Sequence, residues 1–195
     1  MTGAGGARFV PGRVGVVGLG LMGGSFAKAM HAAGREVLGW NRTSSTTELA
    51  LIETIDAVLD DDSIGSCELI VLAGYPQAAI DWLQEKAALV SPGAIVIDTV
   101  GVKRVICERC FAIAEGRPFT FVGCHPMAGT QHSGFAHSRA NMFRGAPMVV
   151  VPPPMDGFAR LDVLERLQAL LEPCGFGSYT LSTADHHDEV IAFTS

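Results

Sequence analysis

A glycine-rich turn is the feature that most constrains how this chain folds. The run Gly18-Leu19-Gly20-Leu21-Met22-Gly23 has the spacing G-x-G-x-x-G, follows a β-branched run at 13–17, and precedes an Ala- and Met-rich helical pattern at 22–33. In such a turn the first glycine permits a tight bend, the second lets a pyrophosphate approach, and the third allows helix and strand to pack closely. The helix N-terminus offers N–H groups to phosphates. We therefore expect these six residues to bind a dinucleotide.

Strand-like and helical patterns alternate through the rest of the chain. Further apolar, strand-like runs lie at 36–40, 69–73, 94–98, 120–122 and 148–151. Helical patterns lie at 46–51, 77–89, 103–114 and 158–171. Continuous apolar strands separated by helices are typical of parallel sheets covered on both faces. The pattern predicts a doubly wound, Rossmann-type α/β fold with a mostly parallel sheet.

The same sequence patterns divide the chain into three expected regions. Residues 1–12 are glycine-rich without a period and are expected to form a flexible tail. Residues 13–182 are expected to form the dinucleotide-binding domain. Residues 183–195 begin a helical pattern that stops without a cap or a breaker, so we expect a chain truncated at the start of a helical second domain.

Charge and cysteine content narrow the class of partner. A net charge of −6 argues against a nucleic-acid or acidic-lipid surface and favours a small-molecule substrate. The apolar run at 14–27 contains five glycines and is shorter than the roughly 20 residues of a membrane span, so no signal or membrane segment is expected. Five scattered cysteines form no disulfide framework and favour a cytoplasmic location.

The end of the second strand bears on which cofactor binds. An acidic residue usually stands there and binds the ribose 2′-hydroxyl of NAD, but this chain has Asn41 followed by Arg42, Thr43 and Ser44. An amide tolerates a 2′-phosphate and a guanidinium can bind it with charge-assisted hydrogen bonds. These residues favour NADP over NAD. The alternative is a solvated Arg42 followed by residues that cap the next helix.

Other candidate cofactor residues follow later strands. Ala73 and Pro76 come after the strand at 69–73 and are expected near the adenine and ribose, although Pro76 is also a common first residue of a helix. Lys103 follows the strand at 94–98 and is expected near the nicotinamide. Its alternative role is that of an exposed lysine at a helix start.

A histidine loop supplies the candidate catalytic group. The segment Gly123-Cys124-His125-Pro126-Met127-Ala128-Gly129-Thr130 follows the strand at 120–122, at the sheet edge where ligands bind in such folds. A histidine there can act as an acid, a base or a polar orienting group near neutral pH. The alternative is a loop histidine that hydrogen-bonds the backbone.

Other groupings carry less weight. Cys107 and Cys110 stand one helical turn apart, which is more typical of a core than of a zinc site when no second pair has zinc spacing. The histidines form no four-ligand set, so no metal is expected. Ser133 lacks the G-x-S-x-G turn of a hydrolase.

Together these motifs resemble one family. The glycine loop GLGLMGGS, the segment DTVGVK at 98–103 and above all GCHPMAGTQHSGF at 123–135 are similar to prephenate dehydrogenase, the TyrA family of tyrosine biosynthesis. The resemblance implies NAD(P)-dependent oxidative decarboxylation of prephenate to 4-hydroxyphenylpyruvate, with His125 hydrogen-bonded to the C4 hydroxyl. It also implies a homodimer, and substrate contacts at a rim formed by Thr130, Gln131, His187 and Ser195.

The chain departs from the family pattern at two positions and leaves alternatives open. Many members have serine where this chain has Gly101, and many NAD-using members have aspartate at Asn41. The alternatives are an arogenate dehydrogenase, a β-hydroxyacid dehydrogenase of the 3-hydroxyisobutyrate type, which the opening GLGLMGGSFAKAM also resembles, and a non-catalytic NADP-binding module. The segment GCHPMAGT favours the prephenate family over the β-hydroxyacid family.

Overall fold

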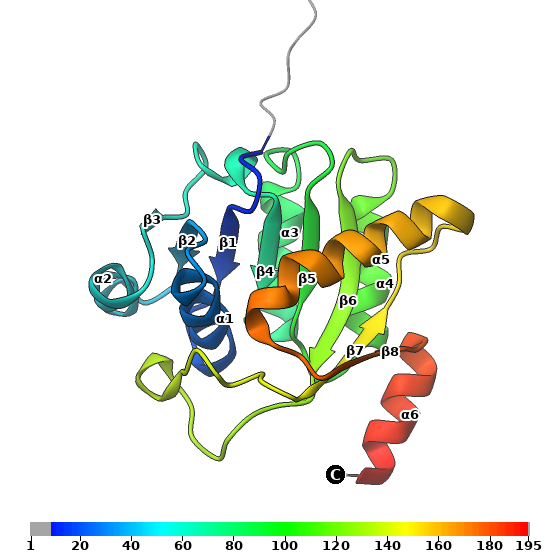
Figure 1. Ribbon diagram of the computed structural model, residues 1–195. Helices are drawn as coiled ribbons and strands as arrows, with labels where there is room; N and C mark the ends of the chain where they lie inside the picture. Colours follow the sequence, from blue (N-terminus) through cyan, green and yellow to red (C-terminus); the bar gives the residue numbers. More distant parts are fainter. Residues whose placement is uncertain (1–8, 195) are drawn as a thin grey trace, which may run out of the picture.

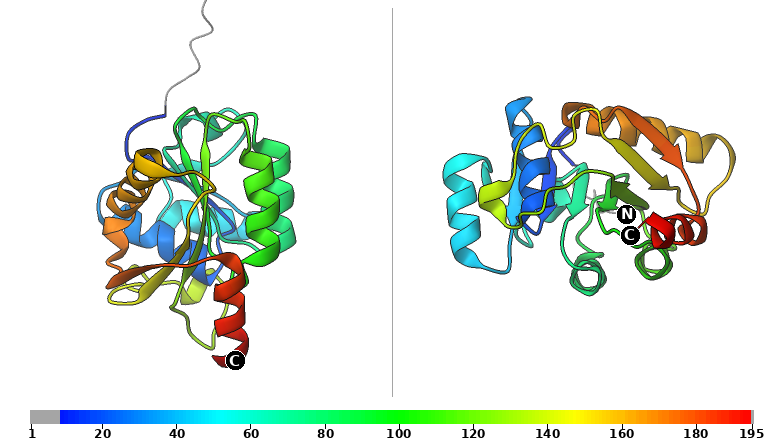
Figure 2. Two further views of the ribbon diagram at one scale, coloured as in Figure 1. Left: turned by 90° about the vertical axis from the view of Figure 1, so that its right-hand side faces the viewer. Right: turned by 90° about the horizontal axis from the view of Figure 1, so that it is seen from below.

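The chain folds into one sheet between two layers of helices, as Figures 1 and 2 show for a computed structural model that describes residues 9–194. The sheet has eight strands in the order β3-β2-β1-β4-β5-β6-β7-β8. Helices α1 and α5 cover one face, and α3 and α4 cover the other. The doubly wound α/β architecture expected from the sequence is confirmed.

The elements have the following bounds. The strands are β1 Val14–Val17, β2 Val37–Trp40, β3 Ala57–Val58, β4 Leu69–Leu72, β5 Ile95–Asp98, β6 Thr120–Pro126, β7 Pro147–Val151 and β8 Ser178–Leu181. The α-helices are α1 Leu21–Ala32, α2 Ser44–Glu53, α3 Pro76–Lys86, α4 Arg104–Ala114, α5 Gly157–Leu171 and α6 Ala184–Thr194. Short 3-10 turns lie at Ile64–Ser66, Phe135–His137 and Glu172–Cys174.

Strands β1 to β6 pair in parallel, and the chain reverses direction once within the sheet. β7 pairs antiparallel with β6, with Gly123 opposite Val151 and Pro126 opposite Met148. β8 then pairs parallel with β7. Because β1, β4, β5 and β6 run the same way, the residues after β1, β4 and β5 and the last residues of β6 share one edge of the sheet.

The core lies on both faces of the sheet, as the apolar strands predict. Val14 and Val16 of β1 face α1 and α5, whereas Ile70 and Leu72 of β4 face α3 and α4. Successive side chains of a strand point to opposite faces, so a strand buried on both sides must be apolar throughout. This burial fixes the register of the central strands and thereby the position of every residue at their ends.

The structure differs from the sequence expectation at three places. β6 continues to Pro126, because pairing with β7 extends it, so His125 lies in a strand rather than in a loop. β3 and β8 were not expected, since β3 has two residues and β8 is a largely exposed edge strand. Residues 9–12 are not loose: Val10 N–H donates to Ser66 O and Gly12 N–H to Glu68. Residues 1–8 of the expected tail lie outside the described residues.

Candidate functional site

The three glycines of the turn differ in the space around them. Gly18 has φ +92°, a conformation that favours glycine. A Cβ on Gly23 would lie 1.8 Å from the carbonyl oxygen of Gly18, whereas a Cβ on Gly20 would meet no atom within 4 Å. Gly23 is therefore required for packing of α1 against β1. Gly20 instead leaves an open surface at the N-terminus of α1, where a phosphate can approach the backbone.

Asn41 ties the glycine turn to the end of β2. Its Oδ1 accepts the N–H of Leu19 at 3.0 Å, and its Nδ2 donates to the carbonyl of Thr43 at 3.3 Å. The Leu19 side chain is buried in the core, so its contribution to the turn is its backbone. The adjoining Arg42 is exposed. Asn41 thus holds the turn in place while Arg42 remains accessible beside it.

These segments border a cleft of about 700 Å³. The sequence-predicted residues that line it are Gly18, Gly20, Leu21, Met22, Asn41, Arg42, Thr43 and Ala73. Sequence reasoning missed a second group, contributed by the end of β2, by α3 and by the loop after β6: Trp40, Tyr75, Trp82, Asp81, Glu85, His132, Ser133 and Gly134. Asp81 and Trp82 each stand about one helical turn from Glu85, so their spacing on a helix indicates a shared face but not what that face borders. The glycine turn on the wall of this cleft is the cradle that a dinucleotide pyrophosphate requires.

Five predicted cofactor residues do not line this cleft. Leu19 and Gly23 are taken up in packing, Ser44 begins α2, and Pro76 begins α3. Lys103 does not line the cleft, and its expected place near the nicotinamide stays a prediction, whereas the alternative of an exposed lysine at a helix start is wrong. Its side chain is 0% exposed and pairs with Asp98, because the ammonium points under β6 instead of out of the sheet edge.

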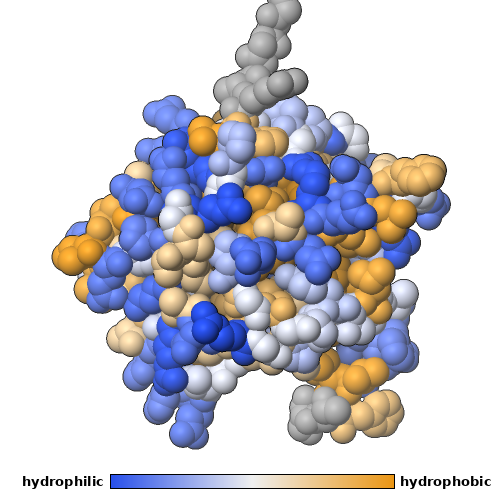
Figure 3. Space-filling model, in the orientation of Figure 1, coloured by the Kyte–Doolittle hydropathy of each residue, from blue (hydrophilic) through white to orange (hydrophobic). Residues whose placement is uncertain are grey.

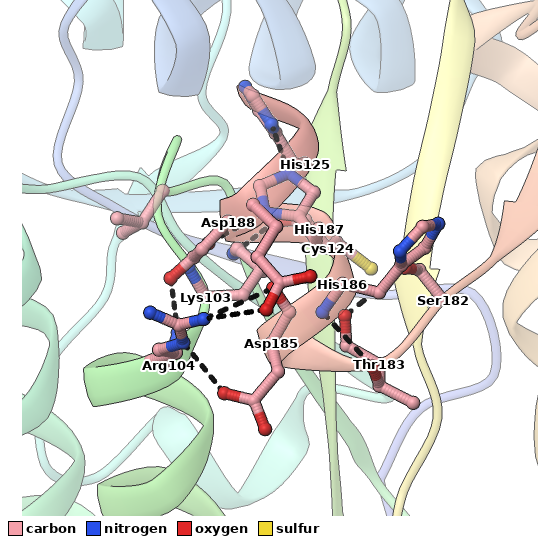
Figure 4. A network of polar contacts seen from close by, with 12 residues as sticks. Lys103, Arg104, Cys124, His125, Ser182, Thr183, Asp185, His186, His187 and Asp188 are labelled. Atoms are coloured by element: carbon pink, nitrogen blue, oxygen red, sulfur yellow. Dashed lines mark hydrogen bonds and ion pairs between the residues drawn. The ribbon is translucent and has the colours of Figure 1, made fainter. Parts of the chain in front are cut away.

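A second polar group lies at the same edge of the sheet, at the end of β6 (Figure 4). His125 is half-buried, and its Nδ1 lies 2.9 Å from Nε2 of His187 on α6. Nδ1 of His187 lies 2.8 Å from Oδ1 of Asp188. A Cβ on Gly101 would lie 3.7 Å from Nε2 of His125, so this nitrogen faces the space that a side chain at position 101 would occupy.

Asp188 also connects α6 to the start of α4. Its Oδ1 accepts the N–H of Lys103 at 2.7 Å and its Oδ2 accepts the N–H of Arg104 at 2.9 Å. The first N–H groups of a helix have no partner within the helix, so Asp188 caps α4 from a distant part of the chain. Arg104 returns a contact through Nε, 2.6 Å from Oδ1 of Asp185.

Beneath His125 lies a fully buried ion pair. Lys103 and Asp98 are both 0% exposed, and Lys103 Nζ contacts Asp98 Oδ2 and also donates to the carbonyl of Cys124 at 2.6 Å. The other oxygen of Asp98 accepts the N–H of Cys124 at 3.0 Å. The pair therefore holds both backbone polar groups of the residue that precedes His125.

The surroundings set the charge of these groups. Burial lowers the pKa of His125 to about 4, the Lys103 ammonium and His187 add to the shift, and Asp188 opposes it. Burial alone would raise the pKa of Asp188, but the N–H of Arg104, the His187 ring and the N–H of Lys103 outweigh it and keep the pKa low. At neutral pH His125 is thus an uncharged imidazole and Asp188 a carboxylate.

The predicted substrate residues are dispersed. Thr130 and Gln131 are exposed in the loop after β6, next to His132, Ser133 and Gly134 of the cleft wall. His187 is not at an open rim: it is 4% exposed and both its ring nitrogens are engaged, since α6 packs it behind His125. Ser195 lies outside the described residues.

The described part of the chain contains neither a candidate metal site nor a candidate membrane-spanning helix. Among residues 9–194, no group of three or more His, Cys, Asp or Glu is arranged to hold a metal ion. In the same range, none of the helices is both long and apolar enough to cross a membrane.

Comparison with known proteins gives consistent matches. Residues 26–177 match the family model described as prephenate dehydrogenase, nucleotide-binding domain. A cyclohexadienyl dehydrogenase of Zymomonas mobilis is 27% identical over 188 residues, which cover 93% of this chain and 62% of that protein. The crystal structure of Synechocystis arogenate dehydrogenase superposes with a TM-score of 0.82 at 31% identity, covering 94% of this chain and 64% of that one.

Two other structures refine this comparison. Aquifex aeolicus prephenate dehydrogenase in complex with hydroxyphenyl propionate and NAD+ has a TM-score of 0.76 at 26% identity, covering 92% of this chain and 62% of that one. A 3-hydroxyisobutyrate dehydrogenase of Mycobacterium tuberculosis has a TM-score of 0.73 at 14% identity, which shows a shared fold only. The chain thus spans somewhat less than two thirds of the length of these relatives.

Proposed function

Because the chain belongs to the prephenate dehydrogenase family, through its nucleotide-binding domain, we propose that it acts in NAD(P)-dependent oxidative decarboxylation of prephenate to 4-hydroxyphenylpyruvate, in tyrosine biosynthesis. The observation that carries the proposal is the position of His125. An uncharged imidazole stands at the end of β6 with Nε2 facing outward, on the same sheet edge as the glycine-lined cleft.

We assign the following roles to residues of this chain in the reaction. The turn at Gly18 and Gly20 and the N-terminus of α1 hold the pyrophosphate of a dinucleotide, whose nicotinamide accepts a hydride when bound. His125 Nε2 would accept a hydrogen bond from the substrate hydroxyl and take its proton as hydride leaves C4 and a ketone forms. When the ring carboxylate leaves as CO2 and the ring becomes aromatic, the same proton returns to that oxygen and gives the phenol. Gly101 leaves that nitrogen uncovered, and the Lys103–Asp98 pair holds the backbone below it.

The test is the absorbance of reduced nicotinamide after mixing the protein with prephenate and NADP+ or NAD+, with arogenate as a parallel substrate. Turnover of prephenate supports the proposal. Turnover of arogenate alone would transfer it to the second candidate, which the similarity to the Synechocystis enzyme favours. If neither substrate reacts although a dinucleotide binds, the chain would be a binding module.

We further propose that NADP is preferred over NAD. Arg42 is exposed on the wall of the cleft, and Asn41 supplies no negative charge there. A guanidinium can donate two hydrogen bonds to a 2′-phosphate, and hydrogen bonds to charged groups each contribute roughly 1.5–3 kcal/mol. Asp81 and Glu85 also line the cleft, and their negative charges would oppose binding of a 2′-phosphate.

Changing the charge at positions 41 and 42 should reverse the preference for NADP over NAD. We expect Arg42→Gln to weaken NADP+ binding by about ten- to a hundredfold, with little change for NAD+. Asn41→Asp is the complementary variant, because its carboxylate still accepts the Leu19 N–H and repels a 2′-phosphate. Calorimetric titration with both cofactors measures the effect. Equal losses for NADP+ and NAD+ would show that Arg42 does not read the 2′ position.

Two single-methyl variants separate packing from binding in the glycine turn. We expect Gly23→Ala to lower the free energy of unfolding by about 1–3 kcal/mol, because its Cβ would collide with the Gly18 carbonyl. Gly20→Ala should leave stability almost unchanged, since its Cβ meets no protein atom within 4 Å, but weaken dinucleotide binding. Urea unfolding and titration of each variant with NADP+ check both. Unimpaired binding by Gly20→Ala would place the pyrophosphate elsewhere.

Assembly and location are also proposals. We expect a homodimer in the cytoplasm, as the family resemblance implies. All five cysteines are free and buried, which suits a reducing compartment. Apolar side chains gather on the surface over α6, at the lower right of Figure 3, where Phe193 is 90% exposed. Light scattering after size exclusion would show the oligomeric state.

A further inference from the structure

We propose that Asp188, acting through His187, is a positioning residue that fixes the tautomer of His125 so that the lone pair is on Nε2. The proposal rests on the proposed function only for the role of that nitrogen as the base. The arrangement itself, a carboxylate and two imidazoles in line, stands on the geometry of α4, β6 and α6 (Figure 4).

The chain of contacts starts from a group that cannot donate. Asp188 accepts backbone N–H groups with both oxygens, from Lys103 and Arg104, at the N-terminus of α4. Two such donors and the helix dipole stabilise the ionised carboxylate. An ionised carboxylate is only an acceptor. The proton in the contact with His187 must therefore be on Nδ1 of His187.

That assignment determines the rest of the series. An imidazole whose single N–H is on Nδ1 has its lone pair on Nε2, so in that form Nε2 of His187 can only accept. Nε2 of His187 lies 2.9 Å from Nδ1 of His125, which must then be the donor. His125 is left with its lone pair on Nε2, the nitrogen that faces Gly101. The position of one carboxylate thus decides which nitrogen of His125 can accept a proton.

The two neighbouring cations, Lys103 and Arg104, contact other carboxylates. The Lys103 ammonium contacts Asp98 and the Cys124 carbonyl under β6. The Arg104 guanidinium contacts Asp185 at 2.6 Å and Glu189 at 3.5 Å. Asp188 is thus the carboxylate that contacts His187, which in turn contacts His125. Because α6 supplies both His187 and Asp188, the contacts that set the tautomer of His125 form when α6 packs against α4.

Imidazole nitrogen NMR tests the tautomer without any substrate. In a two-bond proton–nitrogen correlation spectrum at pH 7, with His125 assigned by its loss in His125→Asn, we expect protonated Nδ1 and unprotonated Nε2. In Asp188→Asn the side-chain amide can donate to His187 Nδ1. This would reverse both rings and move the His125 proton to Nε2.

A matched pair at position 187 keeps the test valid if loss of the α4 cap unfolds Asp188→Asn. His187→Gln retains an acceptor for His125 Nδ1–H and a donor for Asp188, so the tautomer should be kept. His187→Leu removes the acceptor and leaves Asp188 on α4, so the His125 tautomer should become mixed. In turnover, we expect kcat to fall by about tenfold or more for His187→Leu and by less than about threefold for His187→Gln.

The outcomes separate this proposal from the proposed function. A wild-type His125 protonated on Nε2, or the same tautomer in His187→Leu as in the wild type, would overturn the positioning role whatever the substrate. A purely structural role for His187 would lower kcat equally in both variants without changing the tautomer, which also contradicts the proposal. If the NMR results are as expected and neither prephenate nor arogenate reacts, only the proposed function fails.

Discussion

Replacing His125 by asparagine is expected to lower kcat by roughly 10²- to 10⁴-fold, the usual contribution of a general base. Asparagine is close to imidazole in size and can hydrogen-bond a hydroxyl, but it cannot take up a proton at neutral pH. The variant should therefore bind NADP+ and substrate with nearly unchanged affinity. Measuring kcat and the dissociation constant of NADP+ on the same preparation separates the two effects.

The matched control is His186→Asn, which changes an exposed histidine on α6 and should leave kcat unaltered. The wild-type pH profile adds a second check. Because the pKa of His125 is lowered to about 4, its basic form persists below pH 6, and the acid limb of kcat/KM should lie well below 6.5. Turnover of His125→Asn within tenfold of the wild type would remove His125 from the reaction.

The largest expected loss of stability comes from Lys103→Met. Lys103 and Asp98 are fully buried together, and removing one partner leaves an uncompensated charge in the core. Breaking a buried pair in this way costs about 3–5 kcal/mol. The Cys124 carbonyl also loses its donor directly below His125. We expect urea unfolding to show a reduction of this size, with weakened catalysis in the fraction that remains folded.

Arg104→Met is the matched control, because the adjacent cation is half exposed and its contact with Asp185 is at the surface. Surface ion pairs contribute about 0–1 kcal/mol. Adding Asp98→Asn to Lys103→Met should recover part of the loss, since no buried charge is then left alone. If Lys103→Met were no more damaging than Arg104→Met, the pair would not stabilise the fold as its burial indicates.

The chain spans somewhat less than two thirds of the length of its relatives. The described residues provide the glycine-lined cleft and His125, and two of the four predicted substrate residues, Thr130 and Gln131, are exposed in the loop after β6. Prephenate and arogenate differ in a side-chain keto or amino group, so assays with both substrates distinguish the two candidate activities.

The amino-acid sequence alone determined the fold class and the cofactor turn. Glycine spacing is a local property of the backbone, and apolar runs report burial of each strand independently of its partners. Asn41 and Arg42 could be placed for the same reason, because they directly follow a strand whose end borders the turn. These features depend on residues close in the chain or on a period within one element.

Only the tertiary structure decided how the second polar group is assembled. Lys103 looks like an exposed helix start in the sequence, but its side chain turns inward to Asp98 and the β6 backbone. His125 and His187 are 62 residues apart, and Asp188 meets the N–H of Lys103 across 85 residues. Such contacts depend on how α6 docks against α4 and β6, and no period or spacing within a single element encodes that docking.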